Sequence, residues 1–297
     1  MRIGIKPRVD VVFKKVFASA EHSDITRDFL NSLLPLAGLP RIVRLTILNP
    51  FRLADFQGDK EIVVDVHAED ENRREFQIEM QLKRDAGLPS RVMDNLSRLY
   101  GSQVGKGKPY GGHRQTIAIW ILEHRFFGDA NWLHVFRFRD DTSGEVLSDE
   151  LIAITVELPK REVLPGSGVL GTFETGIDEW LWFLEHGEEI DPEESWYQGL
   201  RSELQEAVTI MEAFSKQDKA RYTYDRRLEW ERLQLGMKEE ARAEGMAVGK
   251  AVGLAEGKAE GLAEATRDVA KKMLALGIPP ETIVAATGVP KEELSAL

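Results

Sequence analysis

Two acidic residues, Asp65 and Glu79, have the types and the spacing to bind a divalent cation together. Each lies in a run of alternating polar and apolar residues, 62–68 and 75–82, and this period of two is typical of β-strands. A polar stretch rich in residues that favour chain reversals separates the two runs. We therefore predict an antiparallel hairpin that places Asp65 directly opposite Glu79.

The predicted pairing of Asp65 with Glu79 carries an electrostatic cost. Like charges opposite each other across a sheet are destabilising, so such a pair either raises the pKa of one carboxyl or needs a cation. Gln81 lies on the same predicted face and adds an amide oxygen. Such hard oxygen ligands suit Mg²⁺ or Mn²⁺, which can activate a water for attack on a phosphodiester. The competing interpretation is a solvated polar face on a half-buried hairpin, and the spacing alone leaves both open.

Length and composition restrict the class of protein. The chain has 297 residues, which suggests about two domains. It contains no cysteine, which excludes disulfides and thiolate metal sites and is compatible with a reducing cytoplasm. The first residues lack the apolar run of a signal peptide, and no stretch reaches transmembrane length. We expect a soluble cytoplasmic protein that does not enter a membrane.

The net charge of −11 hides an uneven distribution of charge. Residues 83–114 carry seven Lys or Arg against two Asp, and residues 1–15 are also basic. Residues 145–212 hold seventeen Asp or Glu against three Lys or Arg. The predicted hairpin is thus flanked by basic segments that suit phosphate contacts, while the acidity belongs to a later segment. Charges scattered over the surface are the alternative.

The remaining patterns predict the elements that must position the hairpin. A helix starts at Asp10, which we assign as its N-cap. Further helices are expected over 23–34 and 88–103, and strands over 42–48, 115–122, 134–139 and 151–158. The strand at 115–122 is apolar almost throughout, which is typical of a strand buried on both faces. This order of elements indicates an α/β core with a mixed sheet.

The second half of the chain is predicted to be helical. Helical patterns begin at Gly176 and continue to residue 235. Glycines then recur every four residues from Gly245 to Gly261, although each costs about 1 kcal/mol in a helix relative to alanine. We favour a helix used for self-association over a flexible linker, because a glycine stripe permits close helix approach. The short helical segments that follow have few basic residues and favour a small packing module.

Four segments resemble one known family. They are DVVFKKVF, DKEIVVDVHAEDENRREFQIEMQ, RVMDNLSRLYGSQVGKGKPY and TIAIWIL. They are similar to the recombination-promoting nucleases, transposase-like proteins of the PD-(D/E)XK nuclease superfamily. The glycine-periodic tail with KKMLALGIPPETIVAATGV also looks like the ending common in that family. The resemblance covers nearly the whole chain, and the hairpin segment ending in IEMQ is its most specific part.

The resemblance implies a restriction-endonuclease-like core and metal-dependent cleavage of DNA. Asp65 would match the metal-binding aspartate and Glu79 the second acidic ligand. Gln81 stands where many relatives carry a lysine. An amide cannot supply that positive charge, but it can orient the attacking water.

The resemblance also gives expectations for residues outside the hairpin. Asp10 and Lys14 match the opening motif of the family, without an assigned role. Arg91 and Gln103 match polar positions on the following helix, where they would touch phosphate or support the ligands. The implied division of the chain is a nuclease-like core over 1–160, an acidic helical region over 170–236, and a glycine-periodic helix with a small helical tail over 237–297.

Two hypotheses about function follow. In the first, the protein is a Mg²⁺- or Mn²⁺-dependent DNA endonuclease linked to recombination or mobile elements, and it forms a homo-oligomer through the glycine-striped helix. In the second, it is a non-catalytic oligomeric adaptor or regulator with a vestigial nuclease fold.

Overall fold

A computed structural model describes residues 2–49, 52–53, 62–104, 110–161, 173 and 175–294. The chain separates into two compact units, Met1–Leu228 and Glu229–Leu297. The division into 1–160, 170–236 and 237–297 stays a prediction. Lys106, Lys108 and the start of the hairpin segment at Asp59 lie outside the described residues.

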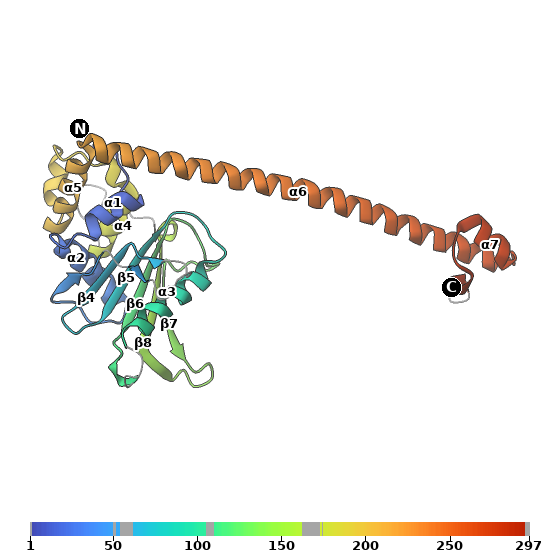
Figure 1. Ribbon diagram of the computed structural model, residues 1–297, viewed down its shortest axis with the longest axis horizontal. Helices are drawn as coiled ribbons and strands as arrows, with labels where there is room; N and C mark the ends of the chain where they lie inside the picture. The colour runs from blue at the N-terminus through green and yellow to red at the C-terminus, as the bar shows by residue number, and fades with distance from the viewer. Residues whose placement is uncertain are drawn as a thin grey trace. The chain divides into compact units, whose positions relative to one another are not determined.

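A six-stranded mixed sheet forms the framework of the first unit (Figure 1). The strand order is β1-β4-β5-β6-β8-β7, in which β5, β6 and β8 are parallel to one another and the other pairs are antiparallel. The strands are β1 (Leu45–Ile47), β4 (Val66–Asp70), β5 (Glu75–Gln81), β6 (Thr116–Leu122), β7 (Leu133–Arg139) and β8 (Val146–Glu157). Two short strands, β2 (Arg52–Leu53) and β3 (Ile62–Val63), pair separately. The predicted α/β core with a mixed sheet is confirmed.

Helices cover both faces of this sheet. On one face the sheet packs against α1 (Asp10–Phe17), α2 (Ser23–Leu33), α4 (Gly176–His186) and α5 (Ser202–Ser215) in the main hydrophobic core. On the other face α3 (Leu88–Ser102) packs against Ala118, Trp120 and Leu122 of β6. Since successive side chains of a strand point to opposite faces, β6 is buried on both, as its apolar sequence predicts.

Several predicted boundaries differ from the structure. The first predicted strand is broken, because β3 ends at Val63 and β4 begins at Val66, so Asp65 lies in a bend between them. The N-cap of α1 is Val9, and Asp10 is the first helical residue. Helix α2 ends at Leu33 and is followed by a 3₁₀ turn that contains Pro35, because proline restricts the residue before it.

Short 3₁₀ turns complete the first unit. They are η1 (Leu34–Ala37), η2 (Tyr110–Gly112), η3 (Leu158–Lys160), η4 (Gly187–Glu189) and η5 (Ser195–Gly199). The acidic segment does not form a separate layer, since α4 contributes the buried Trp180 and α5 the buried Leu204 to the main core.

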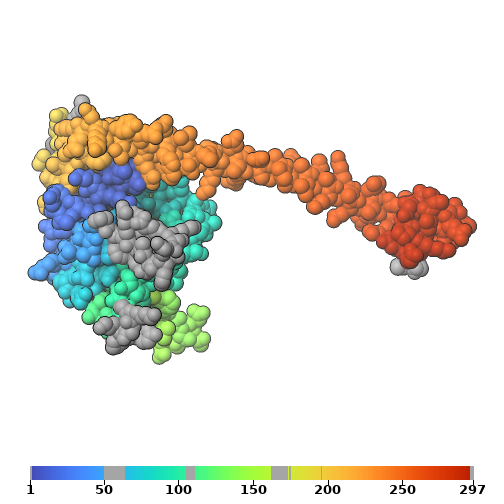
Figure 2. All heavy atoms as spheres, viewed as in Figure 1, coloured from blue at the N-terminus to red at the C-terminus, as the bar shows by residue number. Residues whose placement is uncertain are grey.

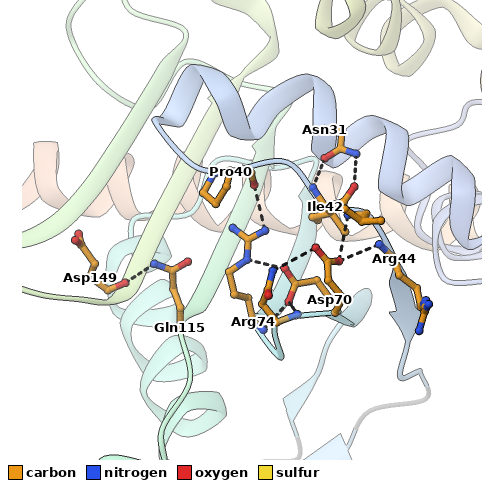
Figure 3. A network of polar contacts seen from close by, with 11 residues as sticks. Asn31, Pro40, Ile42, Arg44, Asp70, Arg74, Gln115 and Asp149 are labelled. Carbon is orange, nitrogen blue, oxygen red and sulfur yellow. Dashed lines mark hydrogen bonds and ion pairs between the residues drawn. The ribbon is translucent and has the colours of Figure 1, made fainter.

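The turn of the central hairpin is fixed by a buried ion pair (Figure 3). The Asp70 carboxylate accepts hydrogen bonds from the backbone amides of Asn72 and Arg74, at 2.9 and 2.8 Å. It also accepts the Arg74 Nε–H at 2.6 Å, and Arg74 Nη2 donates to the carbonyl of Pro40 at 3.1 Å. Arg73 takes a positive φ of 61° to close the turn. The predicted reversal near Asn72 is confirmed.

The second unit is built on a long helix, α6 (Asp218–Ala275), which begins in the first unit. Two short helices, α7 (Pro280–Thr287) and α8 (Lys291–Leu294), pack on its end around Ala270, Ile283 and Leu294. Gly245–Gly261 lie within α6, so the helical prediction for the tail is confirmed and the linker alternative is not. Within the described residues, no helix combines the length and apolar character needed to cross a membrane.

Candidate active site

The central hairpin brings the two predicted acids together. Strands β4 and β5 pair with Val66 opposite Ile78 and His67 opposite Gln77, which is the predicted register. The next residues along are Asp65 and Glu79. The Asp65 amide donates to Glu79 Oε1 at 3.4 Å, and the Met80 amide donates to Asp65 Oδ2 at 3.1 Å. Each carboxylate thus contacts the backbone that carries the other.

Both carboxylates are buried, so the interpretation of a solvated polar face is wrong. Asp65 is 8% exposed and Glu79 is 7% exposed. On this face of the sheet, α3 packs against Trp120, the β6 neighbour of Glu79. His67 is also buried and contacts Glu75 Oε2 through its Nε2 at 3.0 Å.

The charge of the acid pair is only partly compensated. Lys14 Nζ of α1 lies 3.0 Å from Asp65 Oδ1 and forms an ion pair with it. Glu79 Oε1 accepts a hydrogen bond from Gln77 Nε2 at 3.1 Å. Burial, together with the charge of Asp65, raises the pKa of Glu79 to about 8. Both ways of relieving the like-charge contact, a raised pKa and a nearby cation, therefore occur in this site.

Gln81 is held by its neighbours at the end of β5. Its Nε2 donates to the carbonyl of Lys83 at 2.7 Å, and its Oε1 accepts from Arg91 Nη1 at 3.2 Å. The Arg91 guanidinium also lies 5.1 Å from the centre of the Trp120 ring and 3.4 Å from Asp85 Oδ2. The first turn of α3 is thereby fixed against the end of β5, and Gln81 and Arg91 are brought together.

Gln103 lies at the opposite end of α3. Its Nε2 donates to Thr116 Oγ1 at 2.9 Å, and its Oε1 accepts the Arg114 amide at 2.7 Å. Thr116 pairs with Glu75 in the sheet, whereas Trp120 pairs with Glu79. Four residues along a strand correspond to about 13 Å, so Gln103 is separated from the acid pair and ties α3 to the start of β6.

Asp10 is directed towards a different part of the first unit. Its Oδ2 forms an ion pair with Arg227 Nη2 of α6 at 3.0 Å, and its Oδ1 accepts the Val11 amide at 2.7 Å. Lys14 follows one turn later on the same helix and meets Asp65. Of the two residues in the opening motif, Lys14 therefore reaches the acid pair and Asp10 anchors α1 to α6.

The basic residues after β5 differ in their surroundings. Lys83 and Arg84 lie two and three residues after Gln81 in the chain. Arg98 is paired with Asp94 on the same helix at 3.0 Å, and Arg114 donates to backbone carbonyls. Lys83, Arg84 and Arg91 are therefore the basic residues of this segment that lie nearest in sequence or contact to Gln81.

The donor set of the site fits a hard divalent cation. Among the described residues, no group of three or more His, Cys, Asp or Glu is arranged to hold a metal ion. Two carboxylates are nevertheless enough for Mg²⁺, which usually keeps several waters and shares its coordination with substrate phosphates. The raised pKa of Glu79 indicates that the buried pair lacks positive charge. Asp65 and Glu79 are the residues that would hold such an ion.

Two neighbours of the acid pair were not predicted. Gln77, completely buried, donates to Glu79, and its place two residues before Glu79 on the same face was the available signal. Trp120 sits beside Glu79 because β6 runs parallel to β5, a pairing that no local pattern specifies. Its ring supports Arg91 and closes the site on the side of α3.

Comparison with known proteins agrees with this geometry. A family model described as PD-(D/E)XK nuclease family transposase matches residues 7–239. No curated protein and no solved structure matches the chain. The matched span contains the whole sheet, the acid pair, Gln81 and Lys14, and it ends within α6.

Proposed function

Because the chain belongs to the PD-(D/E)XK nuclease family of transposases, we propose that it is a DNA endonuclease that depends on Mg²⁺ or Mn²⁺. The observation that carries the proposal is the buried contact between Asp65 and Glu79, whose charge the described residues compensate only in part. A divalent ion held there would polarise the phosphodiester and lower the pKa of a bound water. The remaining steps belong to residues of the chain.

Gln81 has the role of orienting the attacking water in this proposal. Its amide has both donor and acceptor capacity and is fixed by Lys83 and Arg91. It carries no charge, so it cannot stabilise a leaving alkoxide electrostatically. Arg91 would support Gln81 and lie near the phosphate.

The proposed substrate is DNA, bound through its backbone. Lys83, Arg84 and Arg91 lie next to the end of β5 and would contact phosphates, which gives affinity without sequence specificity. The description of the family as transposases supports a role in recombination or in mobile elements. We place the protein in the cytoplasm, in line with its lack of cysteine.

Plasmid cleavage tests the proposal directly. Supercoiled plasmid is incubated with Mg²⁺ and either the wild type, Asp65→Asn, or Asp94→Asn. Asp94 is a matched control because it is an exposed carboxylate on α3 that pairs with Arg98. We expect nicking by the wild type and by Asp94→Asn, and none by Asp65→Asn. Equal nicking by all three proteins would rule out the assigned site.

A second proposed function is self-association through α6. Along most of this helix, the side chains visible in Figure 2 are not covered by other residues of the second unit. An added Cβ on any glycine from Gly245 to Gly261 would meet nothing within 4 Å. Residues spaced alternately by four and three follow one face of the helix: Val248, Val252, Ala255, Ala259, Leu262, Thr266 and Val269. The four large apolar side chains among them, Val248, Val252, Leu262 and Val269, are exposed.

This face, which we call the heptad seam, fits a second copy of the same helix. A repeat of 3.5 residues keeps an apolar stripe in register with an identical stripe in a coiled coil. Burying Val248, Leu262 and Val269 would also remove the cost of their exposure, which is about 1.5–3 kcal/mol for a fully buried side chain. The seam supports a homo-oligomer, either of an active nuclease or of the non-catalytic adaptor.

Sedimentation of the full chain tests the heptad seam. We expect the wild type to be an oligomer and Leu262→Glu to be a monomer at the same concentration. Met246→Glu is the control, since Met246 is equally exposed but lies off the seam. An oligomer without metal binding or cleavage would favour the adaptor, and a monomeric wild type would rule out the seam.

A further inference from the structure

Among the described residues, a cation that the hairpin does not supply lies against Asp65. Gln81 is neutral, and the nearby Arg91 is already paired with Asp85 and stacked on Trp120. Lys14, from α1, instead points its ammonium at Asp65 Oδ1 at 3.0 Å. It comes from an element about fifty residues earlier in the chain, so the contact exists only because of the fold.

The position of Lys14 is defined by the packing of α1. Val12, Phe13, Val16 and Phe17 of this helix are completely or almost completely buried in the main core. The start of the helix is held by the ion pair between Asp10 and Arg227. The backbone that carries Lys14 is therefore held in place. The Lys14 side chain is 36% exposed, and that of Asp65 is 12% exposed. The ammonium lies at the border between the buried acids and solvent.

We propose that Lys14 is the cationic group of this active site: its ammonium neutralises Asp65 in the empty site and contacts the scissile phosphate once Asp65 coordinates a divalent ion. The proposal rests on the proposed nuclease function. It assigns to a helix residue the positive charge that Gln81 cannot provide. It also makes Lys14 a competitor of the ion for the same carboxylate.

The charges of the groups support this role. A divalent ion balances the two carboxylates of Asp65 and Glu79, and the ammonium of Lys14 then balances one phosphodiester. Without Lys14 the loaded site would lose the cation that lies against Asp65, and poorly compensated charge in a buried position is costly. Lys14 can turn from the carboxylate to a phosphate because its ammonium has three donors on a flexible stem.

The proposal predicts effects of opposite sign for one substitution. Lys14→Gln removes the competitor of the ion, so the affinity for Mn²⁺ should rise about tenfold, since a nearby charge shifts such an equilibrium by one unit or more. The same change should lower single-turnover cleavage about 10²-fold, the effect of removing one group that stabilises charge in a transition state. A merely structural role would lower both quantities or neither.

The experiment compares four full-length proteins: wild type, Lys14→Gln, Lys14→Arg and Lys15→Gln. Lys15 is the matched control because it is the exposed neighbour of Lys14 on the same helix. Mn²⁺ affinity is measured by calorimetry without DNA, cleavage by single-turnover kinetics, and folding by thermal unfolding. We expect wild-type values for Lys15→Gln, near-wild-type Mn²⁺ affinity with partial cleavage for Lys14→Arg, and the opposite shifts for Lys14→Gln.

Two kinds of failure are distinguishable. If the wild type binds Mn²⁺ and cleaves DNA but Lys14→Gln does not tighten Mn²⁺ binding, or cleaves as well as the wild type, the role of Lys14 is wrong and the nuclease function stands. If the wild type neither binds Mn²⁺ nor cleaves, the proposed function fails and the role of Lys14 with it.

Discussion

The two ends of one hairpin hold buried carboxylates in different ways. At the turn, Asp70 is 5% exposed and receives the Arg74 guanidinium at 2.6 Å and two backbone amides. At the open end, Asp65 and Glu79 are buried to a similar extent. The partly exposed ammonium of Lys14 pairs with Asp65, and both acids accept hydrogen bonds from amide groups.

The difference separates an acid held in a structural ion pair from the two acids that we propose to be functional. A buried charge is tolerated when a partner and hydrogen bonds satisfy it, and the turn meets this condition with its own residues. At the open end, burial and then the charge of Asp65 raise the pKa of Glu79 to about 8. The two ends therefore differ in how far the described residues compensate the buried charge, and the less compensated end is the one that we propose to bind a metal ion.

The largest expected effect is on catalysis at the open end. Glu79→Gln should reduce plasmid cleavage about 10³-fold or more, because it removes a proposed ligand of the ion. In the absence of divalent ions, the same variant should be at least as stable as the wild type at pH 8, because a neutral amide replaces a buried acid. Urea unfolding and cleavage assays check both parts. Normal cleavage by Glu79→Gln would show that the acids at the open end of the hairpin are not needed for catalysis.

The matching change at the turn should act on stability instead. Arg74→Met leaves the buried Asp70 carboxylate without its ion-pair partner, which should lower the free energy of unfolding by about 3–5 kcal/mol. Urea unfolding at pH 7 measures this loss. Arg73→Met is the control, since the Arg73 side chain is exposed and its ion pair with Glu69 is long, at 3.8 Å. Equal stabilities of the two variants would show that the turn pair is not needed.

The stability of the wild type without divalent ions should depend on pH through Glu79. Its pKa is about 8 in the folded protein and 4.5 as the ordinary value, so the folded state binds the proton more tightly. The stabilisation is complete below about pH 4.5 and is lost as the pH rises towards 8, by roughly 4–5 kcal/mol. The difference in unfolding free energy between wild type and Glu79→Gln, measured from pH 5 to 8, isolates this contribution. A constant difference would contradict the raised pKa.

The smallest expected effect concerns the far end of α3. Gln103→Ala removes two hydrogen bonds, to Thr116 and to the Arg114 amide, and should cost about 1–2 kcal/mol of stability. Cleavage should stay within about twofold of the wild type once folding is complete, because the acid pair is about 13 Å away along the strand. Single-turnover kinetics at low temperature measure the cleavage rate of the variant and of the wild type. A loss of cleavage comparable with that of Glu79→Gln would place Gln103 in the site.

The hairpin and the class of fold were predictable because they depend on local patterns. The alternation of residue types gave the register of Asp65 against Glu79, and the apolar run at 116–122 gave a strand buried on both faces. Whether the polar face is solvated was not predictable, because its cover, α3, is placed by tertiary packing.

Contacts between distant segments were also beyond the local patterns. Lys14 meets Asp65, and Asp10 meets Arg227, only because α1 is packed into the main core. Arg91 and Gln103 lie near the two ends of α3. Arg91 contacts Gln81 at the end of β5, whereas Gln103 contacts Thr116, which pairs with Glu75 at the start of β5. The family resemblance implied one role for Arg91 and Gln103, in phosphate contact or ligand support, but the fold places them in different surroundings.

The most direct test of the acid pair is a crystal structure of the full chain grown with Mn²⁺, with an anomalous difference map recorded from it. The account predicts one anomalous peak with oxygens of both Asp65 and Glu79 within about 2.0–2.6 Å, and the ammonium of Lys14 moved away from Asp65. A saturating Mn²⁺ concentration that produces no peak there, with Lys14 still bound to Asp65, would contradict it.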